Sequence, residues 1–197
     1  MDQYINSKHF YCAHLSLIHS WGNTLIEAFE QCGMAMFAYM TEIDYVEMKK
    51  CEEIEVEADD MLGLLYRFLD ELLFLFSAEP FLICRKLQIL EFNTSEFRIR
   101  CKCFGEEFTL GKHPQGTEVK AITYSAMQIV EPTQDSPYEL FRHQFDFEAT
   151  KPKVSKNTIL FISVFLRLRS KFYRPATRKR FNFRIRRHGI QSNFGLA

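Results

Sequence analysis

The sequence lacks the features that mark secreted, membrane and metal-binding proteins. Its 197 residues include six cysteines, but no two have the Cys-x-x-Cys spacing of zinc and redox sites. The longest apolar run, residues 159–166, is far shorter than the roughly 20 residues of a membrane-spanning helix. The N-terminus is polar where a secretory signal is apolar. We therefore expect reduced thiols, no membrane association, and a cytoplasmic or nuclear location.

Patterns for catalysis are also missing. The sequence shows no nucleophile beside a base, no glycine-rich loop for phosphate and no clustered metal ligands. We therefore expect a protein that is not itself an enzyme.

Acidic residues are absent from the C-terminal quarter of the chain. Residues 151–197 contain 13 Lys and Arg and no acid, whereas residues 1–150 contain 12 Lys and Arg against 25 Asp and Glu. Phe and Tyr lie between the basic residues from Arg167 onwards, as in segments that bind RNA or direct nuclear import. The alternative is an adventitious tail, because no helical or strand period persists there. We assign 149–197 to a basic extension that we expect to be disordered.

The remaining composition is that of a folded domain. Hydrophobic residues make up 47% of the chain and aromatic residues 15%, which is enough for a sizeable core. We place one domain at residues 8–148.

Two helices and several strands are expected in this domain. Thr24 followed by Glu27 has the spacing of a capping box, and an apolar stripe with several Met residues follows. That stripe indicates a core face, with a partner groove as the alternative. Asp59 and Asp60 have the position of N-caps for a second helix, which Pro80 ends. Strands are expected at residues 10–19, 53–58, 81–92 and 97–104.

The last of these strands, at residues 97–104, has a basic side. Arg98, Arg100 and Lys102 alternate with apolar residues, so they share one face, which is either a solvent face or an RNA contact. Together the pattern predicts an α+β fold with a mixed or antiparallel sheet and two helices packed on one face.

Residues 111–130 combine a turn with a β-rich run. Pro114 and Gly116 suit a tight turn, and polar Lys112, His113, Glu118 and Lys120 lie around it. Exposed polar residues on a loop often serve binding, and a solvated hairpin is the alternative.

Three collinear blocks resemble the archease family. They are Lys112 to Tyr124 (KHPQGTEVKAITY), Trp21 to Cys32 (WGNTLIEAFEQC), and Asp59 to Leu62 leading to Phe68 to Leu72. The resemblance implies the archease fold and an accessory role with the GTP-dependent RNA ligase that joins tRNA halves, promoting its guanylylation and turnover. We take Asp59, Asp60, Lys112, His113, Glu118 and Lys120 as the candidate partner-binding residues.

The resemblance fails at the metal site of the family, which binds a divalent, calcium-like ion. Archeases carry Asp-His-Thr-Ala-Asp before the Trp-Gly pair and an aspartate at the end of the last strand. Alignment on Trp21 places Leu15 at the first ligand, and Asp146 is only a weak stand-in for the second. A hard cation needs several oxygen ligands, so no cofactor is certain here.

Two functions of different class follow. The first hypothesis is an archease-like activator of the tRNA-splicing ligase, impaired if the ligand missing at Leu15 is required. The alternative is a metal-free RNA-binding or interaction module, or a degenerate copy, that carries a basic tail.

Overall fold

The computed structural model describes residues 7–12, 15–130 and 160–169 of the chain. The elements in chain order are β1 (Ser7–Cys12), β2 (Leu15–Gly22), α1 (Leu25–Met40), the short 3-10 helix η1 (Ile43–Tyr45), β3 (Lys50–Glu57), α2 (Met61–Ser77), β4 (Leu82–Asn93), β5 (Arg98–Glu107), β6 (Glu118–Val130) and β7 (Leu160–Arg169). The expected α+β class with two helices is confirmed.

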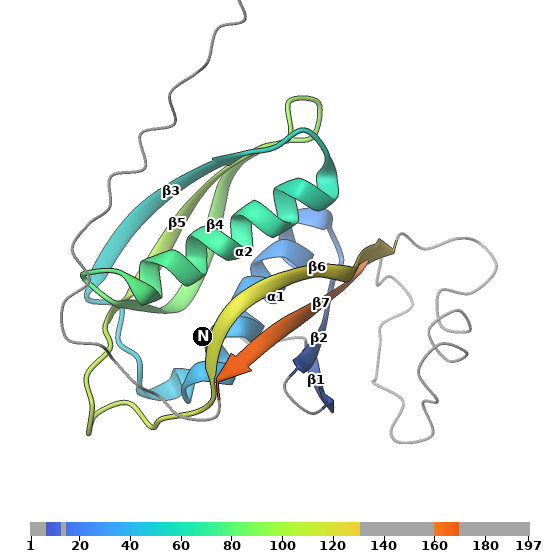
Figure 1. Ribbon diagram of the computed structural model, residues 1–197. Coiled ribbons are helices and arrows are strands. Elements are labelled where there is room, and N and C mark those ends of the chain that lie inside the picture. Colours follow the sequence, from blue (N-terminus) through green and yellow to red (C-terminus); the bar gives the residue numbers. More distant parts are fainter. Residues whose placement is uncertain (1–6, 13–14, 131–159, 170–197) are drawn as a thin grey trace, which may run out of the picture.

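The strands form two sheets. One has the order β1-β2-β7-β6 and the other β3-β5-β4, and each of these strand pairs is antiparallel. Figure 1 shows α1 and α2 between the sheets, where α1 contacts β2 and β4 while α2 contacts β6 and β3. Both sheets can therefore bury an apolar face against the same two helices. No helix among the described residues has the length and hydropathy to cross a membrane.

Strand β7 corrects the domain boundary expected from the sequence. Leu160–Arg169 lies between β2 and β6, so it is an interior strand of the four-stranded sheet and not part of a tail outside the domain. Its sequence, LFISVFLRLR, has the Ile, Val and Phe content that favours strands. The expected boundary at residue 148 was drawn from the change in charge, which does not report strand pairing.

The helix starts follow the predicted caps. The Thr24 hydroxyl accepts a hydrogen bond from Glu27 N at 3.1 Å, and the Glu27 carboxylate accepts one from Asn23 N at 2.8 Å. Asp60 is the N-cap of α2 and accepts from Gly63 N at 2.6 Å. These bonds satisfy amides that have no partner within the helix. Helix α2 ends at Ser77, shortly before Pro80, as expected.

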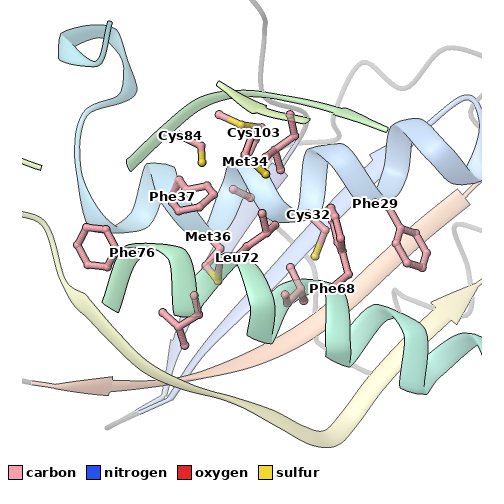
Figure 2. Close-up of a cluster of buried hydrophobic side chains, with 14 of the residues drawn as sticks. Phe29, Cys32, Met34, Met36, Phe37, Phe68, Leu72, Phe76, Cys84 and Cys103 are labelled. Carbon is pink, nitrogen blue, oxygen red and sulfur yellow. The ribbon is translucent and has the colours of Figure 1, made fainter. Parts of the chain in front are cut away.

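The core is formed where the helices meet the sheets. Figure 2 shows Phe29, Met36 and Phe37 of α1 close to Phe68 and Leu72 of α2, with β4 and β5 cysteines beside them. The Met-rich stripe is therefore core. Cys32, Cys84, Cys101 and Cys103 are free and buried, and Cys51 is free and exposed. Burial raises the pKa of the Cys32 thiol to about 12, so the neutral thiol is the stable form.

The basic face of β5 is neutralised by neighbouring strands. Arg98 pairs with Glu91 at 2.9 Å and with Glu55 at 3.7 Å, and Arg100 pairs with Glu53 at 3.5 Å. These are contacts across the antiparallel pairs β3-β5 and β4-β5, where opposite charges stabilise the sheet. The two arginines are therefore engaged with acids, which weakens the RNA interpretation of this strand.

Candidate functional site

A buried carboxylate organises one end of the molecule. Glu106, near the end of β5, has a side chain that is only 7% exposed. It accepts hydrogen bonds from Glu47 N at 2.8 Å, Lys112 Nζ at 2.5 Å and Lys49 Nζ at 3.3 Å. Lys49 and Lys112 also pair with the Glu47 carboxylate. We call Glu47, Lys49, Glu106, Lys112 and His113 the Glu106 cluster.

His113 closes the cluster from inside the protein. Its side chain is fully buried, and its Nδ1 accepts a hydrogen bond from Thr109 N at 2.9 Å. The proton therefore belongs on Nε2, which lies 3.1 Å from Glu106 Oε1 and donates to it. Each ring nitrogen thus has a partner in this tautomer, and the imidazole fixes the turn of residues 109–113.

The electrostatics of the cluster favour the ionised acid. Burial alone would raise the pKa of Glu106, but the hydrogen bonds from Lys112, the Glu47 backbone, His113 and Lys49 outweigh it and lower that pKa to about 2. The same contacts raise the pKa of Lys112, chiefly through Glu106 and then Glu47. Two carboxylates are therefore balanced by two ammonium groups, as a partly buried network requires.

The loop is also fastened to the end of α1. Gly116 N donates to Met40 O at 2.9 Å and Thr117 N donates to Tyr39 O at 3.1 Å. The Thr41 hydroxyl donates to Pro114 O at 2.7 Å. The loop thus satisfies carbonyls that a helix leaves free at its C-terminus. Because it connects β5 of one sheet to β6 of the other, the solvated-hairpin alternative is wrong.

The predicted partner-binding residues do not converge on one site. Lys112 and His113 belong to the Glu106 cluster, and His113 is buried, where exposure was expected. Glu118 and exposed Lys120 lie on β6. Asp60 caps α2 and Asp59 is exposed beside it. The structure therefore separates the set into a loop group, a strand group and a helix cap.

The metal site implied by the resemblance does not fit the described residues. Leu15 of β2 lies opposite Arg167 of β7 in the register, so the first ligand position has a hydrocarbon side chain and its neighbour a cation. Neither residue type can ligate a hard cation. No group of three or more His, Cys, Asp or Glu suited to a metal occurs in the described ranges. Asp146 lies outside the described residues.

Sequence reasoning missed Glu106, Glu47 and Lys49. The strand expected at 97–104 continues to Glu107, and both Gly105 and Glu106 are buried, so the alternation that identified the inward face breaks there. Glu47 and Lys49 lie in a connection with no periodic signal. Only the packing of the loop against that connection brings these residues together. Since every member has a partner, the cluster can hold the loop in place.

Comparison with known proteins places this fold and loop in one family. The family model described as "Archease protein family (MTH1598/TM1083)" matches residues 16–141. "Protein archease-like" of Drosophila melanogaster is 64% identical over 124 residues, covering 63% of this chain and 80% of that protein. "Protein archease" of Danio rerio is 54% identical over 132 residues, covering 66% and 82%.

The architecture agrees with the sequence match. The solution structure of Methanobacterium thermoautotrophicum protein 1598 superposes with a TM-score of 0.61 at 25% identity, covering 84% of this chain and all of that one. The two-sheet α+β domain with its fastened loop is thus an archease-type fold. The chain belongs to the archease protein family.

Proposed function

We propose that this protein is an accessory factor of the GTP-dependent RNA ligase that joins tRNA halves, promoting guanylylation and turnover of that enzyme. In this role it is not itself an enzyme, and its partners are the ligase and the complex around it, in the cytoplasm or nucleus. The observation that carries the proposal is the family match over residues 16–141, which includes the whole loop and strand from Lys112 to Tyr124.

The geometry of the loop supports an interaction role. Leu110 is 59% exposed and Lys112 is 36% exposed, while the buried parts of the loop are held by the Glu106 cluster and by α1. A loop fixed at both ends presents its exposed residues without a large loss of conformational entropy on binding. This suits a protein that acts by docking on a partner.

A second candidate function is favoured by the register of β2 and β7. Leu15 opposite Arg167 provides no carboxylate for a divalent ion at the first ligand position, so a metal-free interaction module remains the alternative. Both candidates keep the same fold and differ in whether the ligase is stimulated.

A ligation assay separates the two. Purified ligase with GTP and its divalent metal is given tRNA halves in excess, and product is followed over many turnovers with and without this protein. The accessory function predicts a higher steady-state rate that saturates with added protein. A rate equal to ligase alone, with the protein folded by circular dichroism, would exclude stimulation and leave the interaction module.

A further inference from the structure

One edge of the three-stranded sheet is regular and open. In the order β3-β5-β4, β3 is an outer strand, and its register with β5 runs without a shift from Lys50 to Glu57 (Figure 1). The opposite edge differs, since β4 has two register shifts and its Ile89 N donates to Glu30 Oε1 of α1 at 2.7 Å. In the part of the chain that the structure describes, β3 is therefore the edge of this sheet to which a further strand can be added.

The free backbone groups of this edge belong to glutamates. Ala58 N donates to Phe97 O at 3.0 Å, directly after the last registered pair of β3 and β5. Backbone groups that face the partner strand alternate with groups that face away, so the outward N–H and C=O groups are those of Glu53, Glu55 and Glu57. The side chains of these glutamates are exposed, whereas Ile54 and Val56 between them are buried. An added strand would thus meet an acidic side and an apolar side.

The charge along this edge is negative. Residues 52–60 contain six acids and no base, while β5 places three bases opposite the glutamates of β3. Two of these bases are arginines 3.5 and 3.7 Å from the β3 glutamates, and both also pair with Glu91. Helix α2, which contacts β3, adds one base and two acids, namely Arg67, Asp70 and Glu71. An added strand would lie about 4.8 Å from β3 and about twice as far from β5, so the β3 acids favour a basic strand.

A segment with this pattern lies in the basic extension. Residues 178–187, RKRFNFRIRR, contain six bases, and apolar and polar residues alternate from Phe181 to Arg186. Pro175, which lacks a backbone donor, precedes the segment, and Gly189 follows it. Although no period persists across residues 151–197, this short stretch has the alternation of a strand with one basic and one apolar side. Its charge and its alternation both complement β3.

The extension begins near the start of β3. Strand β7 ends at Arg169, opposite Glu118 of β6, and the loop of residues 108–117 leads from there to the end of β5, beside the start of β3. Figure 1 shows the end of β7 and the start of β3 at the same side of the molecule, at the lower left. Residues 170–177 can extend to roughly 28 Å, about the length of β3 itself. The segment can therefore meet β3 of its own molecule at a high effective concentration.

We propose that residues 178–187 dock on the free edge of β3 as an additional strand. Arg180, Arg184 and Arg186 then lie beside the β3 glutamates, and Phe181, Phe183 and Ile185 continue the side formed by Ile54 and Val56. The docked segment covers an edge that would otherwise pair with other strands. It also engages bases that would otherwise bind nucleic acid without sequence preference.

Amide hydrogen exchange of the full chain, followed by NMR, tests this contact. The amides of Glu53, Glu55 and Glu57 should exchange about tenfold more slowly in wild type than in a full-length variant carrying Arg180→Glu, Arg184→Glu and Arg186→Glu, which corresponds to a docked fraction of about 90%. The amides of Ile54 and Val56 face β5 and should be equally protected in both proteins. Sodium chloride at 1 M should reduce the difference, because it screens charges beyond about 3 Å.

A second full-length variant is the matched control. Lys151→Glu, Lys153→Glu and Lys156→Glu together make the same change in net charge outside the segment, so this variant should exchange like wild type. Equal exchange of the three glutamate amides in wild type and the first variant would overturn the proposal. Equal loss of protection in both variants would also overturn it, because the effect would then follow overall charge. Protection that disappears on dilution would assign the edge to the extension of a second copy instead. The readout does not involve the ligase, so it is independent of the proposed accessory function.

Discussion

Glu106 is a buried carboxylate whose hydrogen-bond donors come from two segments, one far away in the sequence around Glu47 and one just after it around Lys112. Hydrogen bonds to charged groups contribute about 1.5–3 kcal/mol each when both partners are held, and removing one partner leaves the others desolvated. A single residue thus connects the β5 end, the connection before β3 and the loop before β6.

The acid stability of the fold should depend on Glu106. Its pKa is lowered from 4.5 to about 2, so its contribution to the free energy of unfolding is complete above pH 4.5 and is lost as the pH falls towards 2. Glu106→Gln should lower stability at pH 7 and flatten the pH dependence in that window, as measured by urea unfolding at several pH values.

Glu107→Gln provides the matched control. Glu107 is the next residue, its side chain is 55% exposed, and its only ion pair among the described residues is with Lys50 at 3.7 Å. We expect its variant to follow the wild-type curve within about 0.5 kcal/mol. An acid transition of Glu106→Gln as steep as that of wild type would contradict the assigned role of the cluster.

Leu15 leads to a prediction about metal. With a leucine opposite an arginine at the expected site, we expect calcium not to bind the native state preferentially and therefore not to raise the melting temperature. Differential scanning calorimetry with millimolar calcium and with a chelator measures this. A calcium-dependent rise of several degrees would show that other residues, Asp146 among them, have formed a site.

At the scale of elements, two glycines of the loop between β5 and β6, Gly111 and Gly116, should respond differently to substitution by alanine. A Cβ added at Gly116 would lie 2.5 Å from Tyr39 O, whereas Gly111, with φ +90°, has open space around it. Gly116→Ala must therefore push the loop off α1, at roughly 1–3 kcal/mol as for other overpacked sites. Gly111→Ala meets only the backbone strain of a positive φ, roughly 1–2 kcal/mol.

Hydrogen exchange with mass spectrometry distinguishes these two substitutions. Gly116→Ala should increase exchange at Gly116 and Thr117, the amides bonded to α1, while Gly111→Ala should leave those amides protected. Equal protection in both variants would mean that the contact with α1 does not hold the loop.

Elements with a local signal were predictable from the sequence. The caps at Thr24 and Asp60, the alternation of Ile54 and Val56 in β3, and the apolar stripes of both helices are all read from neighbours in the chain. The Glu106 cluster was not predictable, because Glu47 and Lys112 are 65 residues apart and meet only after the sheets have packed. Division of the strands into two sheets likewise depends on long-range pairing.

At the scale of the whole molecule, charge segregation misplaced the domain boundary. The basic quarter of the chain begins before β7, so composition assigned an interior strand to a tail. Only the register, with β2 on one side and β6 on the other, shows that Leu160–Arg169 completes the sheet. Electrostatic patterning therefore reports the partners a segment attracts and says little about whether it folds.

Two truncations test this view of the molecule. Ending the chain after Thr150 removes β7, which leaves β2 and β6 without their shared neighbour and exposes the apolar surface between them. The free energy of unfolding of a domain is usually about 5–15 kcal/mol. The unpaired backbone groups and exposed apolar area should cost more than this, so this variant should lose its cooperative urea transition. Ending the chain after Arg169 retains every described strand and should keep that transition with an unchanged slope. Cooperative unfolding of the shorter variant at the wild-type midpoint would show that β7 is not part of the folded domain, and the boundary at residue 148 would then be restored.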